Sequence, residues 1–179
     1  MREVRVWGRL AAVAAVVLSG VAVTGCSAVP GGPAIWGSDG RAQDTLCSPV
    51  RTGASVLVAD VLEAPDDTAL EILAVEAVEP RGVSISEIAV APLDRDSGSI
   101  GNSPVPPTDA FTATIWNARV PAAGYKLAAG DRADVLLVAE RTTGETGSIE
   151  NIRLCYRSGG IVYEKEASTR YLFAQTCAE

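Results

Sequence analysis

The sequence predicts an all-β fold, in which one antiparallel β-sandwich follows an N-terminal segment that takes no part in it. Three observations lead to this prediction. From residue 47 onward, short apolar runs are separated by turn residues. One of these runs, residues 133–139, is apolar at nearly every position, as expected for a central strand covered on both faces. The turn Ser158-Gly159-Gly160 between two further runs is the strongest hairpin signal in the chain.

The remaining strands are expected from shorter or alternating runs. Apolar residues alternate in the run that holds Ile85 and Ile88, with a slip between these two that indicates a β-bulge. Alternation elsewhere places Ile152, Leu154 and Tyr156 on one face of a strand. The further predicted strands span residues 55–62, 83–91, 111–116, 149–156, 161–166 and 171–176.

Residues 67–78 fit two structures. Their apolar positions have helical spacing, and Thr68 with Glu71 resembles a capping box. A helix would nevertheless expose Ile72 and Val75. A strand is favoured because the segments on both sides are strands and because Pro80-Arg81-Gly82 suits a hairpin turn. The choice between strand and helix stays open at this point.

The N-terminus has the pattern of an export signal. Arg2, Arg5 and Arg9 precede an almost wholly apolar stretch over residues 10–23. This stretch is shorter than the ~20 residues that a membrane-spanning helix needs, and its length suits a signal peptide. Residues 1–25 are therefore left out of the predicted fold.

The run Val23-Thr24-Gly25-Cys26 at the end of this stretch resembles a bacterial lipobox. The resemblance implies cleavage before Cys26 and attachment of a diacylglycerol to its sulfur by a thioether. The acyl chains would hold the protein at the extracytoplasmic face of the cell membrane, since several chains anchor stably where one binds only marginally. An ordinary secretory signal is the alternative. The predicted organisation is then a signal peptide at 1–25, a lipidated N-terminus with a flexible linker at 26–46, and the sandwich at 47–179. Trp36 is interpreted first as an incidental aromatic of the linker; docking on the domain and contact with a partner are the alternatives.

Charge and composition exclude several classes of function. Residues 1–25 hold three of the 15 basic and one of the 22 acidic residues, so the rest carries 12 basic and 21 acidic residues, a net charge of −9. Such a surface argues against nucleic acid as a partner, because phosphates need clustered Lys and Arg. The chain has no histidine, which excludes a histidine base and most imidazole metal sites.

Three cysteines remain beside Cys26, and an exported protein is expected to form a disulfide. The first choice is Cys47 with Cys177, because that bond would join the two ends of the domain. Cys155 with Cys177 is the second choice. Either pairing leaves one thiol over.

No catalytic residue, metal site or cofactor is predicted from the remaining motifs. Asp94 and Asp96 alternate as in calcium loops, but the twelfth position of that pattern is Val105, so a plain solvated loop over residues 94–109 is expected. Asp131 and Asp134 are read as a turn residue and a strand-edge charge, not as a catalytic pair. The aromatic residues that could line a pocket are few and scattered, and two of them, Tyr156 and Tyr163, are expected to pack across the hairpin. These aromatic residues are Trp116, Tyr125, Tyr156, Tyr163 and Tyr171.

A second, looser resemblance covers residues 47–177. The stretch with Trp116, Gly124-Tyr125 and Gly130-Asp131 that leads into Val135-Leu136-Leu137-Val138 is similar to uncharacterised actinobacterial exported proteins, and residues 156–163 continue the pattern. This resemblance implies an Ig-like sandwich and no particular activity. We expect a membrane-anchored, non-enzymatic interaction module whose partner is an envelope or surface protein. The alternatives are a small-molecule carrier or enzyme accessory with a carboxylate and tyrosine pocket, and a purely structural envelope protein.

Overall fold

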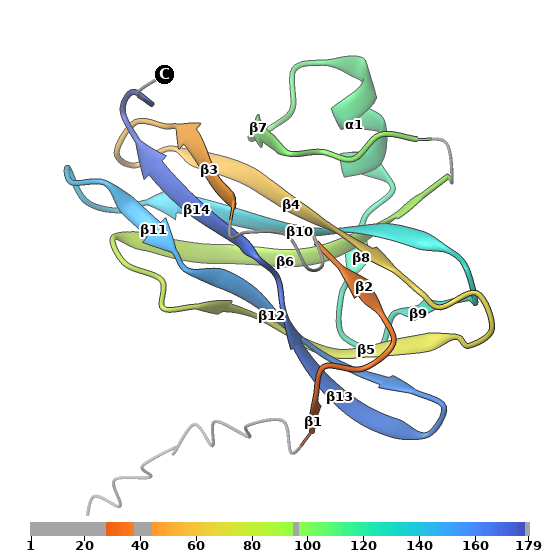
Figure 1. Cartoon of the computed structure of the whole chain (residues 1–179). Coiled ribbons are helices and arrows are strands. Elements are labelled where there is room, and N and C mark those ends of the chain that lie inside the picture. The colour runs from red at the N-terminus through yellow and green to blue at the C-terminus, as the bar shows by residue number, and fades with distance from the viewer. Residues whose placement is uncertain (1–27, 38–43, 95–96, 178–179) are drawn as a thin grey trace, which may run out of the picture.

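The computed structural model describes residues 28–37, 44–94 and 97–177, and its strands form a β-sandwich (Figure 1). The first sheet has the order β1 (Val29–Pro30), β13 (Ile161–Glu166), β12 (Asn151–Ser158), β5 (Leu70–Val78) and β9 (Lys126–Leu127). The second has the order β2 (Ile35–Trp36), β4 (Ser55–Glu63), β10 (Arg132–Arg141), β6 (Val83–Leu93) and β8 (Val120–Pro121), and β7 (Asn102–Pro104) also pairs with β4. The third consists of β11 (Gly147–Ile149), β14 (Thr169–Ala174) and β3 (Asp44–Pro49). The prediction of an all-β sandwich is confirmed.

Most pairs of strands are antiparallel, but two pairs depart from the antiparallel prediction. β1 runs parallel to β13, and β3 runs parallel to β14. Both exceptions involve a strand from the N-terminal part of the described chain that lies beside a strand near its C-terminus. They therefore close the domain by contacts between residues far apart in sequence.

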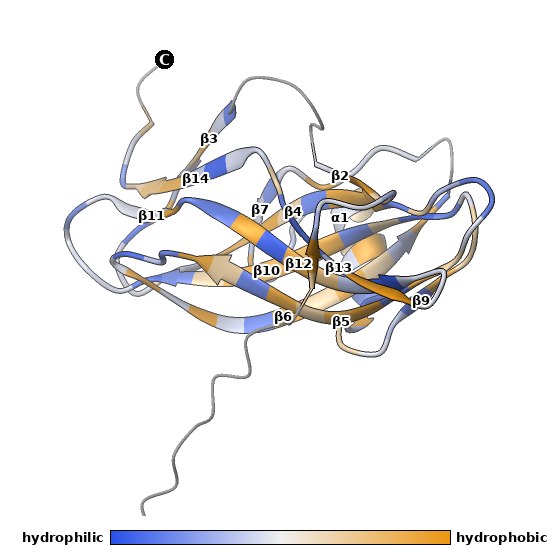
Figure 2. Ribbon diagram, turned by 60° about the horizontal axis from the view of Figure 1, so that its bottom comes forward, coloured by the Kyte–Doolittle hydropathy of each residue, from blue (hydrophilic) through white to orange (hydrophobic). Residues whose placement is uncertain are grey.

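The main core lies between the layers, and its members come from all three sheets. Ile152, Leu154 and Tyr156 are fully buried in it, which confirms the face predicted for this strand. Figure 2 shows the alternation of hydrophilic and hydrophobic residues along β12. β10 lies between β4 and β6 as the central strand of the second sheet, as predicted.

The local irregularities expected from sequence are also present. On β6, Glu87 lies opposite Val138 while Ile85 lies opposite Ala139, so Ser86 is the extra residue of a β-bulge within the predicted slip. The ambiguous segment forms the strand β5 and not a helix. The β12–β13 hairpin turns at Gly159 and Gly160, whose φ angles of 55° and 82° favour glycine at both positions.

One predicted strand is wrong. All of residues 111–116 lie in the helix α1 (Ala110–Asn117), whose N-cap Asp109 accepts a hydrogen bond from the Thr112 amide at 2.8 Å. The alternating pattern suggested a strand, but the cap and the neighbouring surface favour the helix. Ile115 joins a second apolar cluster on the outer face of the second sheet, which α1 helps to cover. Among the described residues, no helix is long and apolar enough to cross a membrane.

The long loop expected at residues 94–109 is more ordered than predicted where the structure describes it. Its residues 102–104 form β7 beside β4, and Ile100 and Ser103 are buried. This loop therefore covers part of the second apolar cluster and is not simply a solvated connection.

Candidate functional site

The residue with the sharpest predicted role, Cys26, lies outside the described residues. The predicted disulfide between Cys47 and Cys177 is confirmed, with a Cα–Cα distance of 5.9 Å and a sequence separation of 130. The bond links β3 to the residues just beyond β14, so it joins the two ends of the domain as expected.

The expectation that one thiol is left over is wrong for Cys155. This residue is buried on β12, with 5% of its surface exposed, and it is disulfide-bonded. The alternation along β12 predicted a polar face for Cys155, between Arg153 and Arg157, but the residue is buried there.

Residues 28–37, called here the N-terminal strap, contradict the prediction of a flexible linker over the whole of residues 26–46. β1 pairs with β13 of the first sheet, and β2 pairs with β4 of the second. Trp36 has no exposed surface, and its indole Nε1–H donates to the Ile152 carbonyl at 3.2 Å. The strap is therefore part of the folded domain, because its apolar residues complete the main core. The described domain begins before residue 47.

Two tyrosines, Tyr156 and Tyr163, form the surface on which the strap packs; this pair is called here the tyrosine seat. Tyr156 and Tyr163 are register partners on the hairpin, and their rings stack with centroids 5.5 Å apart, which confirms the predicted pair. The Tyr156 hydroxyl accepts from the Ala34 amide and donates to the Gly31 carbonyl, each at 3.2 Å. A Cβ at Gly32 would overlap both tyrosines, so only glycine allows this close approach.

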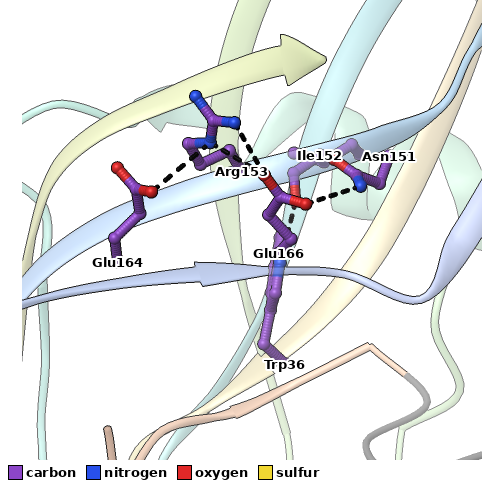
Figure 3. Close-up of polar contacts among 6 residues, drawn as sticks. All are labelled: Trp36, Asn151, Ile152, Arg153, Glu164 and Glu166. Atoms are coloured by element: carbon purple, nitrogen blue, oxygen red, sulfur yellow. Dashed lines mark hydrogen bonds and ion pairs between the residues drawn. The ribbon is translucent and has the colours of Figure 1, made fainter. Parts of the chain in front are cut away.

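An ion-pair network lies beside the strap on the first sheet (Figure 3). Arg153 contacts Glu166 at 2.7 Å and Glu164 at 3.7 Å, and Glu166 also accepts from Asn151 at 2.9 Å. The hydrogen bond from Arg153 lowers the pKa of Glu166, while partial burial opposes this effect. Exposed pairs of this kind contribute about 0–1 kcal/mol to stability, so their main effect is to balance charge on this face.

Two buried carboxylates were not recognised as such from sequence. Asp60 accepts from the Tyr171 hydroxyl at 2.6 Å and from Thr169 at 3.4 Å. Asp134, with no exposed surface, accepts from the Ile100 amide at 2.9 Å through one oxygen, while its other oxygen has no hydrogen-bond partner among the described residues. Burial raises the pKa of Asp60 to about 6 and that of Asp134 to about 7, and the hydrogen bonds to each carboxylate partly oppose this.

These carboxylates do not form a catalytic pair, because they lie on opposite faces of one sheet. Asp60 is opposite Val135, which belongs to the main core, whereas Asp134 is opposite Val61, which packs on the outer cluster. Register partners point to the same face of a sheet. The sequence Ala-Asp-Val-Leu occurs twice, at residues 59–62 and 133–136, and each copy places one of the two aspartates within an apolar strand. A charged residue in such a run was the signal that could have revealed them.

The two carboxylates predict a stability that falls as pH rises. The folded state keeps these protons above the ordinary aspartate pKa, so the folded chain binds more protons between about pH 4 and 7, and stability is lost through that window. In the wild type, the free energy of unfolding should fall between about pH 5 and 7.5. We expect this fall to be smaller by about 1 kcal/mol in Asp60→Asn and by about 2 kcal/mol in Asp134→Asn. Urea unfolding at both pH values measures it. The exposed control Asp131→Asn should change nothing, and equal pH dependence in all four proteins would contradict the assignment.

Of the other candidate carboxylates, Asp94 and Asp131 lie at the surface. Asp96 is outside the described residues, and Asp94 is exposed. Asp94, Asp131, Arg132 and Tyr125 line a shallow groove of about 390 Å³. Burial raises the pKa of Tyr125, and the negative charge of Asp131 adds to this effect. The described residues contain no group of three or more acidic or cysteine side chains placed to hold a metal ion.

A second groove of about 380 Å³ lies between β3, β4 and β7. Its uncharged polar side chains are Ser48, Ser55, Asn102, Ser103 and Gln175, and the Ser48 hydroxyl is buried without a hydrogen-bond partner among the described residues. No charged side chain other than Arg51 lines it.

Comparisons with known proteins give only distant similarities. No family model and no curated protein matches the chain. Among solved structures, the VesB protease of Vibrio cholerae is similar over 79% of this chain at 10% identity, with a TM-score of 0.41; the chain covers 31% of that protein. A PapD-like domain of human CEP192 is similar over 82% of this chain and 87% of its own length, at 8% identity and a TM-score of 0.40. Neither similarity is close enough to carry an argument about activity.

Proposed function

We propose that this protein is a lipid-anchored, non-enzymatic interaction module on the extracytoplasmic face of the cell membrane. The observation that carries the proposal is the run Val23-Thr24-Gly25-Cys26 directly after a short apolar stretch with an arginine-rich start. The domain that follows would present a folded sandwich to an envelope or surface protein.

The arrangement of the polar residues supports a binding role over a catalytic one. The two aspartates with raised pKa values lie on opposite faces of the second sheet, and Tyr156 and Tyr171 are fully buried. Acid–base catalysis needs such groups within reach of one substrate. A pocket that joined the buried aspartates and tyrosines would have favoured an enzyme.

The proposal requires that the sulfur of Cys26 be bonded to the lipid. A thioether to diacylglycerol and a disulfide cannot both form at one sulfur atom. The proposal therefore requires a thioether and no disulfide on Cys26 in the exported protein, and Cys155, which is disulfide-bonded, serves as the comparison cysteine. Both residues therefore enter the test.

The test compares the wild type with Cys26→Ala and Cys155→Ala in a bacterial host that processes lipoproteins. We expect the wild type and Cys155→Ala to stay in the membrane fraction after an alkaline wash. Cys26→Ala should lose lipid attachment and accumulate as uncleaved precursor, because the lipid is added to that thiol. Normal cleavage and full membrane retention of Cys26→Ala would overturn the anchor.

Crosslinking in living cells, followed by capture of the anchored protein and mass spectrometry, tests the interaction role. A protein recovered in near-equal amount would support it. Recovery of nothing above background, with the anchor intact, would favour a small-molecule or structural role.

A second candidate function rests on the groove with Asp94, Asp131 and Tyr125. Its carboxylates and phenol provide the polar groups of a small-molecule carrier, the alternative expected from sequence. A screen of small cationic and polyhydroxy compounds by thermal shift tests it. A rise in melting temperature that is absent in Asp131→Asn would favour the carrier.

A further inference from the structure

The N-terminal strap fixes where the proposed lipid would leave the domain. Only Ser27 separates Cys26 from Ala28, the first described residue, and Val29 is already paired with Tyr163. Three residues of extended chain span at most about 11 Å, so a lipid on Cys26 would be attached close to Val29. The flexible spacer expected from sequence is therefore missing between the lipid position and the domain.

The strand direction points to one end of the sandwich. β1 runs parallel to β13, with Val29 opposite Tyr163, so the chain enters β1 from the side of Ile161 and the β12–β13 turn. Figure 1 shows β1 and β13 side by side, at the opposite end of the view from α1.

Apolar side chains are exposed at the same place. Val29 and Ile161 are 53% and 49% exposed, and they are two of the five large apolar residues with high exposure among the described residues. Ile161 lies two positions from the register partner of Val29, about 7 Å along the strand. Two exposed apolar residues beside a lipidated terminus suit the boundary between headgroups and acyl chains.

Cationic side chains lie next to the turn. Lys126 and Arg157 line a shallow groove of about 230 Å³, together with the backbone of Gly159 and Gly160. Glu71 is paired with Arg157 at 2.9 Å, and Arg153 contacts Glu164 and Glu166. The carboxylates on this part of the first sheet are thus largely balanced, in contrast to the net charge of −9 after residue 25.

We propose that the β12–β13 turn end of the sandwich, with Val29, Ile161 and Lys126, rests on the same lipid bilayer that holds the anchor. This inference depends on the proposed lipidation of Cys26. Ile161 and Val29 enter the interfacial region, and Lys126 faces the phosphate groups of the lipids. Asp66 and Asp67 lie in the turn before β5, whose first residue Leu70 pairs with Ser158 beside the β12–β13 turn, so anionic lipid would be repelled and the contact relies on apolar insertion.

The test places a tryptophan at Ile161 or at Phe111 in the lipidated full protein. Phe111 is the matched control, because it is also 49% exposed but lies on α1, outside the second sheet. Each variant is reconstituted in phosphatidylcholine vesicles with brominated acyl chains, and the fluorescence of the parent protein is subtracted. We expect the tryptophan of Ile161→Trp to be quenched at least twice as strongly as that of Phe111→Trp, with emission at shorter wavelength.

The outcomes separate the inference from the proposed function. Equal quenching of the two variants, in protein that floats with the vesicles and carries lipid on Cys26, would overturn the orientation and leave the anchor intact. Protein without lipid on Cys26 would overturn both. Unfolding curves for each variant show that the added tryptophan leaves the domain folded.

Discussion

Replacement of Trp36 by alanine should reduce the free energy of unfolding by about 3–5 kcal/mol, because a fully buried indole is lost from the main core and a cavity remains. The Ile152 carbonyl, which accepts from Nε1 at 3.2 Å, would also lose its side-chain donor. Urea unfolding measures this effect.

Trp116→Ala is the matched control for this substitution. Trp116 lies on α1, is only partly buried and stacks with the Arg119 guanidinium, 3.4 Å from the ring centroid. Loss of this partly exposed ring should cost about 1–2 kcal/mol. If Trp36→Ala reduced the free energy of unfolding no more than Trp116→Ala, the strap would not be part of the cooperative fold. That result would also contradict the inferred position of the anchor.

Removal of the Cys47–Cys177 bond should reduce the free energy of unfolding about as much as Trp36→Ala does. The bond closes a loop with a sequence separation of 130, which the chain-entropy model equates to about 3–5 kcal/mol of stability. The effect should be largest in the third sheet, because β3 pairs only with β14 within the described sheets. The double variant Cys47→Ala/Cys177→Ala removes the bond without leaving a thiol.

Hydrogen exchange combined with urea unfolding distinguishes local from global loss. We expect faster exchange over β3 and β14 than in the wild type, and nearly unchanged relative protection in β10. A double variant as stable as the wild type would show that the contacts between β3 and β14 hold these ends together without the disulfide.

The sequence predicted the elements whose pattern is set by burial alone. β10 is apolar because both of its faces are covered, and the face of β12 with Ile152, Leu154 and Tyr156 packs between the layers. The bulge at Ser86 could be predicted because one extra residue shifts every later side chain to the other face.

Elements set by distant contacts could not be predicted in the same way. The strap has linker composition, and its order depends on contacts with distant segments: the pairing of β1 with β13 and of β2 with β4, the Tyr156 hydroxyl, and the burial of Trp36. The residues of α1 alternate like a strand, but the Asp109 cap and the outer face of the second sheet favour a helix. Asp60 could be placed in a strand, but its partner Tyr171 is 111 residues away along the chain.

Mass spectrometry of the N-terminal peptide, from protein extracted from membranes without reduction, tests the lipid anchor most directly. We predict that the mature chain begins at Cys26 and that this residue carries a diacylglyceryl thioether. A disulfide-linked peptide containing Cys26 and Cys155, or an unmodified Cys26, would contradict the anchor and with it the proposed contact between the β12–β13 turn and the bilayer.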